Sequence, residues 1–117
     1  MDLNAAINKH AEWKIKFRTA ISRQELMDSD NISKDKCCEL GKWLHEEAKA
    51  KHGGMVSYSD CVGKHAVFHV EAGKVARKIN ARLYTEAETM IGNGTPYAVA
   101  SSAVGVAINR LKKEAGL

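Results

Sequence analysis

The chain has 117 residues, 44% apolar and 27% charged, which excludes a disordered segment and favours a single globular domain over residues 1–117. The formal charge of +4 comes from basic residues scattered along the chain without an aromatic–basic motif, so nucleic-acid binding is not expected. No stretch has the length of a membrane span, and Met1-Asp2-Leu3 does not begin a signal peptide, which argues against membrane insertion and secretion.

The first predicted helix runs from about Leu3 to Leu26, with Asp2 as its N-cap. Its apolar side chains recur at three- and four-residue steps and therefore share one face. His10 falls within this stripe, whose other members are Leu3, Ile7, Phe17 and Ile21. An imidazole at such a position either packs in the core or binds a ligand there.

A second predicted helix begins near Ser33, after a polar stretch at residues 28–31, and continues to about Lys51. Gly53 and the glycine after it supply the C-terminal turn. Cys38 lies early in this helix, where the helix dipole favours a negatively charged sulfur. The inner face consists of Cys37, Leu40, Gly41, Leu44 and Ala48, with Cys38 and Trp43 near its boundary.

The third predicted helix is long and extends from a cap at Ser57 to about Ile91. Two internal glycines, Gly63 and Gly73, are expected to allow the close approach of another segment. The inward stripe carries a second and a third histidine, and it reads Cys61, His65, Phe68, His69, Ala72, Ala76, Ile79 and Leu83.

Thr95-Pro96 marks the start of a fourth helix, with threonine as the cap and proline in the first turn, and Gly116 marks its end. Its apolar side consists of Ala100, Val104, Ala107, Ile108 and Leu111. Four amphipathic helices joined by short loops predict an all-α fold, an antiparallel four-helix bundle.

The inward-facing histidines point to a metal site, because helical bundles often bind metals in the core through side chains of facing helices. His65 and His69 are one turn apart and project from one face, so both can reach a common ion. With His10 from another helix and a cysteine from a third, the set matches the nitrogen and sulfur ligands of tetrahedral zinc. Packed core histidines are the alternative.

The spacing leaves the sulfur ligand open, because Cys61 lies one turn before His65 and competes with Cys38. On a helix, Cys37 would point about 100° away from Cys38, which makes it a packed residue or a resolving thiol for an oxidised Cys38. Three cysteines, two of them adjacent, do not resemble a disulfide framework and favour a reducing, cytoplasmic location.

Three short segments carry a family resemblance. Residues 38–43, Cys-Glu-Leu-Gly-Lys-Trp, resemble the C-x-L-G-x-W signature of the chemoreceptor zinc-binding domains, often called CZB domains. Residues 10–13 are similar to the H-x-x-W element of that family, and residues 65–69 are similar to its H-x-x-F-H element. The segments follow the family's order and cover roughly residues 7 to 72, while the chain from about Gly73 carries no signature.

The resemblance implies one zinc ion per chain, held by His10, Cys38, His65 and His69, and it chooses Cys38 as the sulfur ligand. It also implies a homodimer that regulates an attached signalling module, either a chemoreceptor or a diguanylate cyclase. The signal is zinc itself or an oxidant such as hypochlorous acid, which would convert the redox-reactive Cys38 thiolate to a sulfenic acid. His45 and His52 lie outside the signature and are expected at the surface.

No enzymatic activity and no catalytic residue are expected, because four protein ligands fill a tetrahedral zinc whereas a catalytic zinc keeps a position open for water. Two other functions stay open. One is a bundle that binds a different metal, as in a hemerythrin-like di-iron protein, although the required carboxylate spacings are not evident. The other is a non-sensory protein-interaction module in which the histidines are simply packed.

Overall fold

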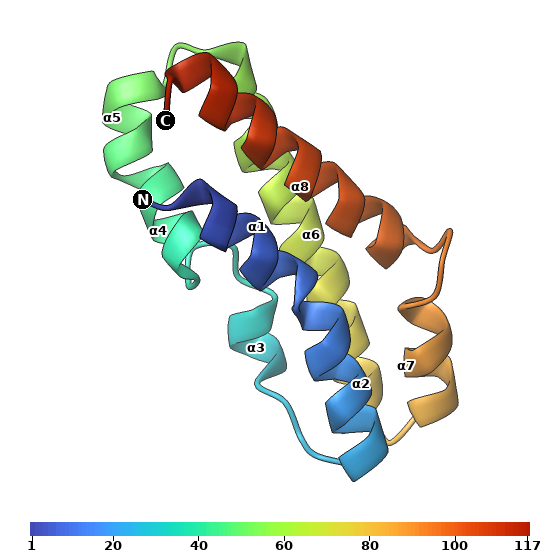
Figure 1. The fold of residues 1–117 in the computed structure, drawn as a ribbon. Helices are drawn as coiled ribbons and strands as arrows, with labels where there is room; N and C mark the ends of the chain where they lie inside the picture. The colour runs from blue at the N-terminus through green and yellow to red at the C-terminus, as the bar shows by residue number, and fades with distance from the viewer.

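The computed structural model describes residues 1–117 and consists of helices without any strand (Figure 1). The eight helical segments are α1 (Leu3–Ala11), α2 (Trp13–Arg23), α3 (Ser29–Ile32), α4 (Glu39–His45), α5 (Glu47–His52), α6 (Val56–Asn80), α7 (Tyr84–Met90) and α8 (Pro96–Ala115). The all-helical fold is as predicted. The prediction of four continuous helices is wrong, because three of them are interrupted. None of the helices combines the length and the apolar character that a membrane crossing requires.

The long helices α6 and α8 lie side by side and antiparallel along the length of the molecule (Figure 1). Helices α1 and α2 pack against this pair, and the chain then returns through α3, α4 and α5 along α6. Successive passes therefore alternate in direction, as in an antiparallel bundle. The largest fully buried side chains come from α2, α4, α6, α8 and the residue that follows α7, and they include Phe17, Phe68, Leu40, Leu44, Ile79, Ile91, Ile108 and Leu111.

The first predicted helix consists of two segments that meet at Glu12. Glu12 keeps helical dihedral angles (φ −66°, ψ −18°), so the interruption is local. Asp2 caps α1 as predicted, since its carboxylate accepts a hydrogen bond from the Ala5 amide at 3.0 Å. The helix ends before the predicted Leu26, because Gln24 adopts a left-handed conformation (φ 54°) that terminates it.

The second predicted helix begins at Glu39 rather than near Ser33. Ser33 instead follows the short helix α3, and residues 33–38 form turns and bends. The prediction that Cys38 lies inside a helix is therefore wrong, because Cys38 is the N-cap of α4. A second break, at Glu46 (φ −117°, ψ −92°), separates α4 from α5.

The third predicted helix divides into α6 and α7. Met55 rather than Ser57 occupies the N-cap position of α6, and Ser57 is buried. The helix ends at Asn80, whose side-chain amide makes two hydrogen bonds of 2.8 Å to the backbone of Met27 in the loop after α2. The fourth predicted helix is confirmed, with Thr95 as its cap.

Candidate metal centre

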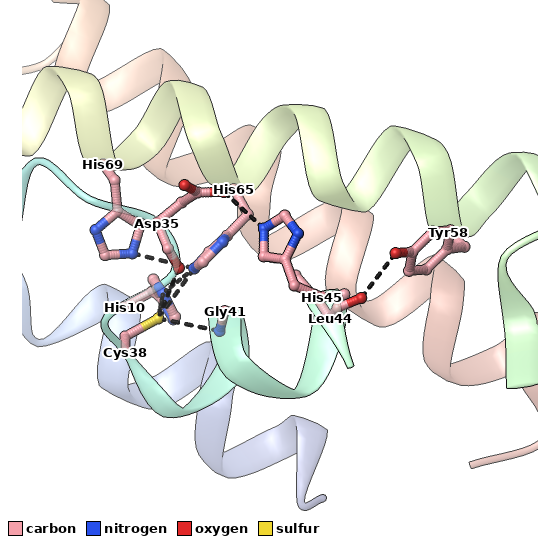
Figure 2. A network of polar contacts seen from close by, with 9 residues as sticks. All are labelled: His10, Asp35, Cys38, Gly41, Leu44, His45, Tyr58, His65 and His69. Atoms are coloured by element: carbon pink, nitrogen blue, oxygen red, sulfur yellow. Dashed lines mark hydrogen bonds and ion pairs between the residues drawn. The ribbon is translucent and has the colours of Figure 1, made fainter. Parts of the chain in front are cut away.

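Four side chains from three helices converge near the middle of the molecule (Figure 2). His10 lies in the last turn of α1, Cys38 is the N-cap of α4, and His65 and His69 occupy successive turns of α6. The three imidazoles are 5%, 0% and 3% exposed, respectively, and Cys38 is half-buried. The structure therefore brings together the four residues that the family resemblance selects.

The donor atoms of these side chains face one common point. Nε2 of His65 lies close to each of the other three donor atoms, at 3.2 Å from Nε2 of His10, 3.0 Å from Nε2 of His69 and 3.2 Å from Sγ of Cys38. Sγ of Cys38 lies 4.0 Å from Nε2 of His10, and all four donor atoms lie within 4.8 Å of one another.

These separations fit one tetrahedral zinc ion. Zinc–nitrogen bonds of about 2.0–2.1 Å and a zinc–sulfur bond of about 2.3 Å place the corners of a regular tetrahedron about 3.3–3.6 Å apart. Four of the six donor pairs, at 3.0, 3.2, 3.2 and 4.0 Å, bracket that range, and the other two pairs are no more than 4.8 Å apart, so small side-chain movements would complete the tetrahedron. The donor set, three imidazole nitrogens and one sulfur, is also one that zinc accepts.

Backbone carbonyls orient two of the imidazoles. Nδ1 of His10 donates to the carbonyl oxygen of Ala6 at 2.7 Å, and Nδ1 of His69 donates to that of Ile32 at 2.7 Å. A carbonyl oxygen can only accept, so the proton lies on Nδ1 and the Nε2 lone pair faces the common point. Such outer hydrogen bonds typically fix the tautomer of metal-binding histidines.

The buried imidazoles are neutral at physiological pH. Burial, together with the neighbouring His69 and His10, lowers the pKa of His65 to about 3. Burial also lowers the pKa of His10 and of His69, partly offset by their hydrogen bonds to backbone carbonyls. A proton on Nε2 of His65 could be donated to only one of the two neighbouring Nε2 atoms at 3.0–3.2 Å, whereas a cation between the three nitrogens would bind the lone pairs of all of them.

The Cys38 sulfur accepts a hydrogen bond from the Gly41 amide at 3.3 Å, so it caps α4 in the manner of an N-cap oxygen. Burial raises the pKa of the Cys38 thiol, and hydrogen bonds from backbone amides, that of Gly41 foremost, oppose this effect. The helix N-terminus alone therefore does not ionise the thiol. A cation at the common point would supply the missing stabilisation of the thiolate.

A sequence profile described as the chemoreceptor zinc-binding domain matches residues 10–76, which is more than half of the chain and includes all four converging residues. This chain belongs to the chemoreceptor zinc-binding domain family. No curated protein and no solved structure matches it. In this chemoreceptor zinc-binding domain, residues 77–117, which include α7 and α8, lie outside the matched segment.

A second layer of contacts, which the sequence pattern does not reveal, holds the Cys38 loop. Nε2 of His45 donates to the carboxylate of Asp35 at 3.0 Å, and both side chains are partly buried (Figure 2). His45, which was expected at the surface, is thus only partly exposed and is paired with Asp35. Burial opposes ionisation of Asp35, but the hydrogen bond and charge of His45 outweigh it and hold the pKa of the carboxyl below its ordinary value.

The two remaining cysteines lie outside the converging group. Cys61 is fully buried one turn before His65, and burial raises the pKa of its thiol to about 12. Cys37 is exposed, with its sulfur 4.0 Å from the side-chain oxygen of Asn31. The prediction that Cys37 packs on the inner face of the second helix is therefore wrong, because this residue precedes α4 and its side chain is exposed.

Proposed function

We propose that His10, Cys38, His65 and His69 bind one zinc ion in this CZB domain, and that the domain regulates a chemoreceptor-type signalling protein. The observation that carries the proposal is the convergence of four donors within 4.8 Å, three of them buried. Bound zinc would hold the sulfur as a thiolate and tie α1, α4 and α6 together at one point.

We further propose that the domain has no catalytic activity. Four protein donors complete a tetrahedral shell, and a catalytic zinc instead keeps one position for water or substrate. The carboxylates that a di-iron centre requires are not part of the group, and the nearby Asp35 carboxylate is paired with His45.

The proposed signal is oxidation of Cys38, with zinc availability as a second input. Cys38 is the least buried member of the group, and a thiolate is the form of cysteine that oxidants attack. Conversion to a sulfenic acid would weaken the metal site and, by removing the negative charge of the sulfur, also weaken the hydrogen bond from the Gly41 amide that caps α4. Both changes would loosen the packing of the start of α4 against α1 and α6. This change in helix packing is what the domain would transmit to the attached signalling module.

We propose that the domain acts as a cytoplasmic homodimer attached to its signalling module, a chemoreceptor or a diguanylate cyclase. Supporting this, α8 exposes Val99 and Val106, two turns apart on one face, at 62% and 71%. On the neighbouring α6, Val67 and Val70 are 51% and 48% exposed. Sedimentation of the wild type and of Val106→Glu tests the dimer, which the charge should weaken.

Native mass spectrometry of two matched cysteine variants tests zinc binding. Wild type and Cys61→Ala should each carry one zinc per chain, and Cys38→Ala should lose zinc under the same conditions. Because loss of an outer hydrogen-bond partner already costs about 10–100-fold in metal affinity, loss of a ligand should cost at least as much. Retention of zinc by Cys38→Ala together with its loss from Cys61→Ala would reject the ligand assignment.

A further inference from the structure

A cavity of about 530 Å³ opens beside the metal centre, between α1 and the start of α4. Two of the four donor residues, His10 and Cys38, line this cavity, together with residues that include Ala5, Trp13 and Leu40. The next cavity, of about 460 Å³, lies beside α2 and touches none of the four. The larger cavity is therefore the one that borders the metal centre.

An exposed ion pair joins the two sides of this cavity. Nζ of Lys9 on α1 lies 3.0 Å from the carboxylate of Glu39 on α4, and both side chains also line the cavity. They are 63% and 69% exposed, which places the pair at the rim. Exposed pairs of this kind are weak, so this one can break without a large free-energy cost.

The rim carries no excess of positive charge that would concentrate anions. Lys9 is paired with Glu39, and Lys16 lies over the ring of Trp13 at 4.6 Å. The acidic side chains that line the cavity are Asp2, Glu12 and Glu39. With apolar walls and this charge balance, the cavity suits a small neutral solute better than an anion.

We propose that this cavity is the entry site through which a small neutral two-electron oxidant, of which hypochlorous acid is the probe, reaches Cys38, and that the Lys9–Glu39 pair restricts its mouth. The inference rests on the proposed oxidant response of the same cysteine. The thiolate sulfur takes Cl⁺ from hypochlorous acid and hydroxide leaves. Water then displaces chloride from the S–Cl bond, leaving S–OH and a proton, so that sulfur has lost the two electrons that chlorine has gained.

A filled cavity tests the route. Ala5→Leu places a larger side chain in the lining of the cavity, and Ala98→Leu is its matched control, because both alanines are partly buried and both backbone amides donate a hydrogen bond to the side-chain oxygen of a helix cap. The background is Cys37→Ser, which removes the exposed thiol. With zinc-loaded protein and hypochlorous acid, Ala5→Leu should release zinc and form Cys38 sulfenic acid several-fold more slowly than Ala98→Leu. Equal rates would overturn the proposal.

Lys9→Ala tests the opening of the cavity by widening it, whereas Ala5→Leu fills the cavity. The Lys9→Ala variant is informative even where Ala5→Leu folds poorly. Removal of the ion pair should accelerate oxidation of Cys38 several-fold, with zinc affinity unchanged. An unchanged rate would overturn the role of the pair. A wild type that reacts with hypochlorous acid only at residues other than Cys38, and keeps its zinc, would show that the proposed redox response itself fails, whereas a reactive wild type with insensitive variants rejects only the entry route.

Discussion

Gly41 lies so close beneath Asp35 that a Cβ added at residue 41 would stand 1.6 Å from the Asp35 carbonyl oxygen. The first turn of α4 and the loop before it are therefore in direct backbone contact. The same turn donates the Gly41 amide to the Cys38 sulfur at 3.3 Å. The glycine thus allows the loop to fold back and present the sulfur to the histidines (Figure 2).

Gly41→Ala should displace this loop and move Cys38 away from the imidazoles. We expect a zinc affinity at least about tenfold weaker, comparable to loss of an outer hydrogen-bond partner, and a lower melting temperature. Gly63→Ala is the matched control, since a Cβ there meets nothing within 4 Å and the helix should gain about 1 kcal/mol. Competition with a chromogenic chelator measures affinity, and equal affinity in the two variants would contradict the positioning role of Gly41.

Asp35→Asn should weaken zinc binding because the carboxylate holds His45 across the Cys38 loop at 3.0 Å. We expect a loss of about tenfold in affinity with little change in helix content. Glu47→Gln, which breaks the exposed pair with Lys51, serves as the control and should leave affinity unchanged. Matching affinities for the two variants, measured by calorimetric titration, would show that the Asp35 contact does not position the loop.

The metal-free protein should lose stability as the pH falls below about 6.5, the ordinary histidine pKa. Burial lowers the pKa of His65 to about 3, so the unfolded chain binds a proton that the folded one does not, and folding weakens over the interval between these values. At pH 5 the loss from His65 amounts to about 2 kcal/mol. Urea unfolding in chelator at pH 7 and pH 5 measures it, and His65→Leu should show a smaller difference between the two pH values.

Removal of zinc from the loaded protein should lower its melting temperature. A ligand that binds only the folded state stabilises it, by about 4 kcal/mol at a free concentration a thousand times the dissociation constant. Differential scanning calorimetry with and without a strong chelator checks this expectation. Cys38→Ala should respond far less to the chelator, and an identical response would mean that the stabilising metal binds elsewhere.

The helical spacing was sufficient to predict which histidines converge, because His65 and His69 share a face of α6 and His10 interrupts the apolar face of α1. Local signals also predicted α8, whose N-cap is Thr95 and whose C-cap, Gly116, has a φ of 69°. These features depend on residues within one or two turns of each other.

The position of Cys38 could not be predicted in the same way, because long-range contacts determine it. The loop before Cys38 packs on Gly73 of α6, where a Cβ would lie 2.5 Å from that of Ser33. Gly73 thus permits the predicted close approach, whereas Gly63 faces open space. A prediction from helical periodicity treats residues 33–38 as part of a continuous helix. It therefore could not show that Cys38 is the N-cap of α4.

Zinc K-edge X-ray absorption of the loaded protein tests the central claim most directly. The proposed site should give a single sulfur scatterer at about 2.3 Å and three imidazole nitrogens at about 2.0–2.1 Å from the zinc. The sulfur contribution should vanish in Cys38→Ala and persist in Cys61→Ala. A shell that contains only nitrogen and oxygen, or a sulfur signal that survives in Cys38→Ala, would contradict it.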